Sequence, residues 1–347
     1  MLTEHELAKY ISNNLRLYLP DEDQNVVCNI VEISRINQGP AVGLKVEVPQ
    51  SNRVPIVYMD VIKDALADGA SREDIMESFV ELVQKVKNEP DINLKRVDPS
   101  DYNSVKSFLS LMLINTDVNR RMLEDIPHKE IEDLSLITYL NVPERAGLGR
   151  GIIKVKRDLL EAWGITEAEL FETAEKNEIA ANPPVLVGLK DLLENSNPRN
   201  YLLDPISKPM KSTDPDMYLL TSKQSAFGAS VIINTDVLDR ISNMFPDGFC
   251  IIPSSIHDVI IVSDSDRKNY GDLREIVRNV NMTSCSPDEI LSNNVYSYDQ
   301  KSKSIQRVKE SVLIKEQEQP PFTRTAPFKT EFTEDTYKSK DTDIEKV

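Results

Sequence analysis

The segment from residue 218 to residue 263 constrains the fold more than any other part of the chain. After Asn234, which can cap a helix, apolar residues follow at helical spacing as far as Phe245. Four short apolar runs bounded by polar residues, glycine or proline are typical of buried strands: 218–221, 229–233, 249–252 and 259–262. The segment is therefore predicted to form two strands joined by a hairpin over 222–228, a helix, and two further strands.

The same grouping of strands and helices recurs towards the N-terminus. An amphipathic helix is predicted over 3–18, paired strands over 25–36 and 41–48, and two helices that begin near Tyr58 and Ser71. Paired strands followed by helices favour separate sheets over alternating parallel units. The sequence therefore predicts an α+β fold, with antiparallel or mixed sheets and helices packed on one side.

Composition divides the chain into four parts. Residues 1–178 form an N-terminal α+β region, and 217–315 form a C-terminal α+β region. Between them, 179–216 is rich in Pro, Asn, Ser and Asp, which is typical of a linker or a long connection with one short helix near Leu189. Residues 316–347 have few aliphatic side chains and several prolines. That segment is predicted to be a disordered tail, because it cannot bury enough apolar surface to offset its ordering entropy.

The formal net charge of −16 limits the partners that we expect. Phosphate backbones repel an acidic chain, so no nucleic acid is expected to bind. No apolar run approaches the roughly 20 residues that a membrane-spanning helix needs, and no membrane association is expected. The N-terminus lacks the basic start and apolar core of a signal peptide, so we expect a cytoplasmic protein.

Cofactor and metal motifs are missing from the sequence. No C-x-x-C pair occurs, and the three histidines, His5, His128 and His257, form no H-E-x-x-H pair. The glycines of 147–151 have neither a G-K-[ST] triplet nor the G-x-G-x-x-G spacing, and a hairpin loop explains them better. We therefore predict no cofactor and no metal site.

The connection between the last two predicted strands of the 218–263 segment concentrates reactive residue types. Ser254, Ser255, His257 and Asp258 supply a hydroxyl, an imidazole and a carboxylate, which are the groups used in acyl transfer. The alternative is a turn that begins at Pro253, with serines bonded to nearby backbone groups. Since known triads assemble from distant parts of a chain, the turn is the simpler interpretation. A non-catalytic binding site at the same turn remains a third.

His128 is a second candidate site residue. It follows Glu124 and Asp125, and two carboxylates near an imidazole can bind a metal or move a proton. The alternative is a polar loop that leads into the next strand. The polar loop is the simpler of these two interpretations.

Several segments, occurring in a fixed order, carry a family resemblance. They read LINTDVNRRMLEDIPHKEIEDLSLITYL, LLEAWGITEAELFETAEKN, YLLTSKQSAFGASVIIN and FCIIPSSIHDVIIVSD. Over roughly residues 3 to 305 the chain resembles a family of bacterial proteins, mostly from anaerobic gut Firmicutes, catalogued as domain of unknown function 5688. That family usually has glutamate after the histidine, where this chain has Asp258. The resemblance implies a bacterial, cytosolic α+β protein and assigns no activity.

Two main functions fit these observations, and catalysis stays open. The first is a cytosolic, non-catalytic binding or regulatory protein with an unknown protein or small-molecule partner. The second is a hydrolase or transferase that uses the turn at 254–258, with His128 as a further candidate. Convergence of His128 with His257 in one cleft would favour the enzyme. A host-interaction or mobile-element accessory role is a third hypothesis.

Overall fold

The structure is a computed structural model, and it describes residues 2–51, 53–88, 98–142, 151–194, 198–203, 217–263 and 270–308. The tail predicted over 316–347 and most of the glycine loop lie outside these residues. No helix in the described part of the chain combines the length and apolar character that crossing a membrane requires.

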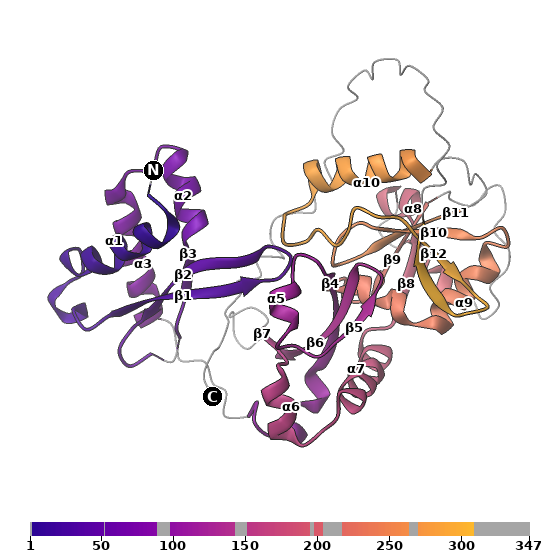
Figure 1. Cartoon of the computed structure of the whole chain (residues 1–347), viewed down its shortest axis with the longest axis horizontal. Coiled ribbons are helices and arrows are strands. Elements are labelled where there is room, and N and C mark those ends of the chain that lie inside the picture. Colours follow the sequence, from indigo (N-terminus) through magenta and orange to yellow (C-terminus); the bar gives the residue numbers. More distant parts are fainter. Residues whose placement is uncertain are drawn as a thin grey trace, which may run out of the picture.

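The N-terminal part of the chain is a three-stranded antiparallel sheet covered by helices (Figure 1). Its strands are β1 (Val27–Arg35), β2 (Gly39–Glu47) and β3 (Ile56–Tyr58). Its helices are α1 (Glu4–Asn14), α2 (Met59–Ala67) and α3 (Arg72–Asn88), with short 3₁₀ helices at Leu15–Leu17 and Asp21–Asp23. Leu7 and Ile11 of α1 pack with Leu44 of β2 and Phe79 of α3 in one apolar core. The predicted first helix and hairpin are confirmed.

The second sheet has four strands in the order β4, β6, β5, with β7 paired to β6. The strands are β4 (Leu109–Asn115), β5 (His128–Ile131), β6 (Leu134–Val142) and β7 (Gly151–Lys154). The nearby helices are α4 (Tyr102–Val105), a 3₁₀ helix at Lys106–Phe108, α5 (Arg120–Leu123), α6 (Arg157–Trp163) and α7 (Glu167–Ala181). Helix α7 covers the outer edge of β4, where Glu178 accepts a hydrogen bond from the Leu111 amide at 3.2 Å.

The third sheet has six strands in the order β13, β12, β10, β11, β9, β8. The strands are β8 (Pro184–Gly188), β9 (Met217–Ser222), β10 (Phe249–Pro253), β11 (Val259–Ser263), β12 (Tyr296–Asp299) and β13 (Ser304–Arg307). The helical elements are α8 (Leu189–Glu194), 3₁₀ helices at Tyr201–Leu203 and Gly228–Ile233, α9 (Thr235–Met244) and α10 (Tyr270–Ser284). Every strand pair in the described residues is antiparallel, so the predicted α+β class is confirmed.

One apolar core joins the second and third sheets. Leu113 and Leu136 of the second sheet share it with Leu220 and Ile251 of the third, and Ile241 of α9 packs into it. Helix α10 lies over the other face of the third sheet, where a smaller cluster gathers Cys250, Ile252, Val277 and Val295. The two sheets therefore form a continuous body in which loops from both meet.

The tip of the β1–β2 hairpin attaches the N-terminal part to this body (Figure 1). Asn37 is 7% exposed and has a left-handed φ of 57°, which asparagine tolerates better than most residues. Its side chain accepts hydrogen bonds from the Asn115 amide at 3.0 Å and from Asn119 Nδ2 at 2.7 Å, and donates to the Asp288 carbonyl at 3.1 Å. The hairpin tip thus holds the β4–α5 turn beside the loop that follows α10.

The predicted strand at 229–233 is wrong, because this run is a 3₁₀ helix. The chain turns back tightly at Gly228, where a Cβ atom would lie 2.6 Å from the Ser222 amide and 2.7 Å from the His257 carbonyl. The predicted hairpin over 222–228 is also wrong, since β9 pairs with β8 and β11. Apolar composition alone does not distinguish a buried strand from a buried helical turn.

Candidate functional site

The predicted site residues at 254–258 form the turn between β10 and β11. The Ser255 amide donates to the Asp258 carbonyl at 3.2 Å, and the His257 amide donates to Ser255 Oγ at 3.0 Å. Ser255 is 8% exposed. The chain bends here because a serine hydroxyl can replace a backbone acceptor two residues away. The Ser255 hydroxyl is therefore engaged within the turn itself.

Both ring nitrogens of His257 contact a neighbouring group. Its Nδ1 accepts a hydrogen bond from the Phe227 amide at 3.1 Å, and its Nε2 lies 3.6 Å from Glu289 Oε1. The ring also stacks on Phe227 with centroids 5.4 Å apart. Because the backbone amide occupies the Nδ1 lone pair, the ring proton sits on Nε2 and points at Glu289. The nearby His257 ring lowers the pKa of Glu289.

Asp258 and Cys285 are the other titratable groups at this turn. Burial raises the pKa of Asp258, against the opposing effect of a hydrogen bond from Ser254, and its Oδ1 is buried without a partner. The Cys285 thiol donates to the Ser254 carbonyl at 3.3 Å, and burial raises the pKa of that thiol as well. A raised thiol pKa disfavours the thiolate that nucleophilic attack requires. Among the described residues, no serine hydroxyl bonds the His257 ring.

Replacing Asp258 with asparagine is expected to raise the free energy of unfolding at pH 7 by about 1 kcal/mol, since it removes a buried charge with an unpaired oxygen. The folded-state pKa of Asp258 is raised, so its charge destabilises the fold above that pKa and stops doing so once the carboxyl is protonated in both states. The advantage of the variant should therefore shrink as the pH falls into the ordinary carboxyl range.

Urea unfolding of the wild type and Asp258→Asn at pH 7 and at about pH 4 checks this prediction. Asp247→Asn, on an exposed turn, is the control and should change little at either pH. An Asp258→Asn variant that is less stable than the wild type at pH 7 would show that the carboxylate stabilises the turn.

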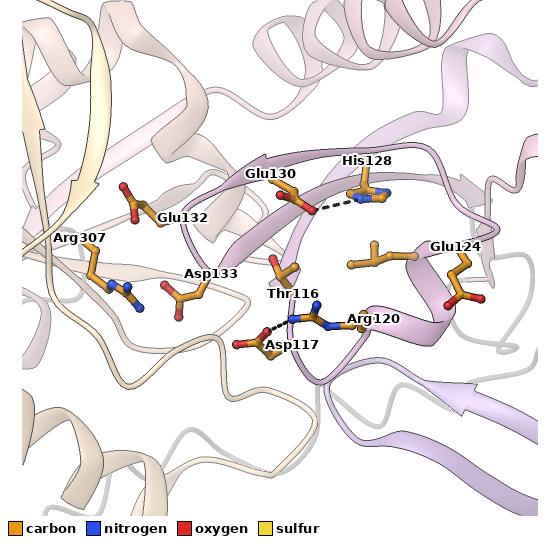
Figure 2. Close-up of a pocket in the computed structure, with 10 residues that line it drawn as sticks. Thr116, Asp117, Arg120, Glu124, His128, Glu130, Glu132, Asp133 and Arg307 are labelled. Atoms are coloured by element: carbon orange, nitrogen blue, oxygen red, sulfur yellow. Dashed lines mark hydrogen bonds and ion pairs between the residues drawn. The ribbon is translucent and has the colours of Figure 1, made fainter.

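A separate cavity of about 450 Å³ lies where the second and third sheets meet (Figure 2). This volume falls within the range of small-molecule sites. Its walls come from the β4–α5 turn, from β5 and the turn after it, and from the end of β13. The lining residues are Thr116, Asp117, Arg120, Leu123, Glu124, His128, Glu130, Glu132, Asp133 and Arg307.

His128 enters this cavity from the first position of β5, so it lies in a strand and not in a polar loop. Its Nδ1 is 2.9 Å from the Ile126 carbonyl, which fixes Nδ1 as the donor and leaves Nε2 as the acceptor of the neutral ring. Two residues along the strand, Glu130 shares its face, and Glu130 Oε1 lies 3.8 Å from His128 Nε2. Figure 2 shows both side chains on the same side of the cavity.

The remaining charged groups differ in how far they are paired. Asp117 binds Arg120 at 2.5 Å. The carboxylate of Asp133 accepts three hydrogen bonds from the segment that leads into β12, namely from Ser292 Oγ, Asn294 Nδ2 and the Tyr296 hydroxyl, at 2.8, 2.9 and 2.6 Å. Burial, and then the charge of Asp133, raises the pKa of Tyr296. In the described residues, Glu124, Glu132 and Arg307 make no hydrogen bond or ion pair through their side chains.

The structure places the predicted site residues in two separate groups. His128 lines the cavity together with Glu124, whereas none of the residues 254–258 does. Sequence reasoning missed the acids that follow His128, although alternation along a strand could have paired His128 with Glu130. It also missed Arg307, which lies far away in the chain and carries no local signal.

The chain belongs to a family of unknown function, DUF5688, whose family model matches residues 5–300. That range contains both groups of candidate residues except Arg307. Searches of curated proteins and of solved structures found no match.

Proposed function

We propose that this chain is a cytosolic bacterial binding protein that holds a small polar ligand in the cavity formed by residues 116–133 and Arg307, without converting it chemically. The observation that carries the proposal is the cavity itself, of about 450 Å³, with charged side chains that have no partner in the described residues. Glu124, Glu132 and Arg307 are all exposed there. Convergent polar groups in a concave site are what a ligand recognises.

The lining of the cavity supports binding more than catalysis. It contains no serine or cysteine, and the hydroxyl of Thr116 is hydrogen-bonded to Ser135 at 2.8 Å. His128 and Glu130 can accept hydrogen bonds, yet the lining places no serine hydroxyl or cysteine thiol beside them. The acidic net charge of −16 also favours a small ligand over nucleic acid.

A hydrolase or transferase at the 254–258 turn is the alternative. The buried, unpartnered Oδ1 of Asp258 favours it, because a catalytic role is one explanation for a buried polar atom without a hydrogen-bond partner. The contacts of the His257 ring weaken the hydrolase or transferase alternative. The ring already accepts a hydrogen bond from the Phe227 amide and faces Glu289, whereas a general base needs a free lone pair near the nucleophile.

A thermal-shift screen tests the binding proposal. Nucleotides, sugars, amino acids, amines, divalent metals and small acyl compounds are added to the wild type, His128→Ala and His257→Ala. A ligand at about 100 times its Kd stabilises the native state by about 2.7 kcal/mol, which raises the melting temperature by roughly 5 °C. We expect His128→Ala to lose at least half of that ligand-induced shift and His257→Ala to keep it.

Comparing ligand-induced shifts, instead of melting temperatures, removes any intrinsic effect of each substitution. Loss of the shift in His257→Ala alone would favour the turn as the binding site. Absence of any shift across all ligand classes would count against small-molecule binding altogether.

A further inference from the structure

We infer that the ligand of this cavity is an organic cation whose amino or guanidinium group lies between His128 and Glu130. The inference rests on the proposed binding function and names the chemical class of its ligand. Two independent observations carry it: the fixed orientation of the His128 ring, and the balance of charge around the cavity.

The orientation of His128 gives the first argument. Its Nδ1 hydrogen is used by the Ile126 carbonyl at 2.9 Å, so the neutral ring presents the Nε2 lone pair to the cavity. The Glu130 carboxylate presents a second acceptor 3.8 Å away. A nitrogen that carries two or more hydrogens can lie about 2.9 Å from both atoms and donate to each of them. Ammonium and guanidinium groups have such hydrogens, and anions do not.

The ring is also held in place. The His128 side chain is 20% exposed, and its backbone pairs with Ile137 of β6, the central strand of the second sheet. A side chain fixed by a strand and by a hydrogen bond to a carbonyl gives up little entropy when a ligand binds. The acceptor atom is therefore oriented before the ligand arrives.

The charge balance gives the second argument. Once Asp117 and Arg120 neutralise each other, the lining keeps four carboxylates against the single arginine Arg307. Figure 2 shows Arg307 beside Asp133 and Glu132, and His128 with Glu124 towards the opposite end. The end that holds His128 thus carries two carboxylates, Glu124 and Glu130, and the arginine nearest to them in Figure 2, Arg120, is paired with Asp117. A cation is attracted there, and an anion is repelled.

The donor set fits an organic cation better than a metal ion. In the described residues, no three His, Cys, Asp or Glu side chains come close enough together to hold a metal. His128 and Glu130 supply two ligand atoms, whereas structural zinc takes four and calcium takes six or more. An amine needs only hydrogen-bond acceptors, and two of them suffice to orient it.

Isothermal titration calorimetry with defined probes tests the inference. Agmatine and 1,4-diaminobutane are the cationic probes, succinate is the anionic probe and ribose is the neutral one. We expect the cationic probes to bind the wild type and the other two to bind at least tenfold more weakly. Glu130→Gln and His128→Phe should each raise the Kd of the cationic probes about tenfold. The first removes the negative charge of one acceptor, and the second removes the other acceptor altogether.

Glu132→Gln is the matched control. It makes the same change of charge in the same cavity, on a side chain that lies near Arg307 and away from His128 (Figure 2), and should raise the Kd less than about twofold. An equal rise in the Kd of the cationic probes in Glu130→Gln and Glu132→Gln would show general electrostatic attraction. It would overturn the placement of the cationic group between His128 and Glu130.

The other outcomes separate this inference from the proposed function. Binding of succinate or ribose that depends on His128, with no binding of the amines, would keep the cavity as a binding site and overturn the cationic class. Failure of every probe to bind, together with no shift in the thermal screen, would overturn both.

Discussion

Replacing Gly228 with alanine is expected to lower the free energy of unfolding by about 3–4 kcal/mol. A Cβ atom there would contact Thr221 Oγ1 and lie 2.6 Å from the Ser222 amide nitrogen and 2.7 Å from the His257 carbonyl oxygen. The Ser222 amide belongs to the paired strand β9, and the His257 carbonyl accepts a hydrogen bond from Thr221 Oγ1 at 2.8 Å. Neither backbone atom can therefore move without disturbing existing contacts. Overpacking against rigid neighbours costs about 1–3 kcal/mol, and more where backbone must shift.

Gly164→Ala is the control for this prediction. Gly164 ends α6 with a left-handed φ of 67°, and nothing lies within 4 Å of its added Cβ. Its cost is therefore conformational, about 1–2 kcal/mol. Denaturant unfolding of both variants measures the difference. A Gly228→Ala protein as stable as Gly164→Ala would show that the backbone near residue 228 adapts easily.

Replacing Asn37 with alanine is expected to destabilise the protein by about 3 kcal/mol. The substitution removes the side-chain hydrogen bonds to Asn115, Asn119 and Asp288, and it leaves the Asn115 amide and the Asp288 carbonyl without their partners. An orphaned buried polar group costs about 1–3 kcal/mol. Part of the loss also comes from the φ of 57°, which alanine adopts less readily than asparagine.

Asn37→Gly separates these two contributions. Glycine accepts the left-handed backbone but makes no side-chain hydrogen bond, so it should recover about 1 kcal/mol relative to alanine. Amide hydrogen exchange gives a local readout, since exchange at Asn115 should accelerate in both variants. Unchanged protection at Asn115 would show that the hairpin tip does not stabilise the β4–α5 turn.

Elements with strong local signals were predictable from the sequence. Thr166 and Glu169 have the S/T-x-x-E spacing of a capping box, and both of its reciprocal hydrogen bonds form at the start of α7. Ser71 and Asp74 do the same before α3, with hydrogen bonds of 2.8 and 3.0 Å. The hairpin of β1 and β2 follows from two long strand-like segments joined by a turn that contains glycine. In each case the determining residues are close together in the chain.

Elements that depend on distant partners were not predictable. Strand β5 is four residues long and includes the charged Lys129 and Glu130, and it is a strand because β6 pairs with it. Strand β8 lies in a segment rich in proline and asparagine, and it pairs with β9. Intrinsic propensity is a weak guide in such cases, because pairing decides the conformation.

The residues of the candidate site likewise include some that the sequence indicated and others that only tertiary packing brings together. His128 was identified because it stands near acidic residues in the sequence, and the structure places it in the cavity. Arg307 and Asp133 reach the same cavity from different sheets, and only the packing of the second sheet on the third brings them together. The turn at 254–258 was the more obvious cluster, yet its histidine bonds Phe227 and Glu289, which local sequence could not indicate.

The most direct test of the central claim observes the histidines during ligand binding. The chain has only three, His5, His128 and His257, so a long-range nitrogen–proton NMR spectrum resolves one set of imidazole signals for each. During titration with a ligand found in the screen, the account predicts a saturable shift of the His128 Nε2 signal, with His257 and His5 unchanged. A saturable shift of His257 with His128 unchanged would contradict the account and place the functional site at the 254–258 turn.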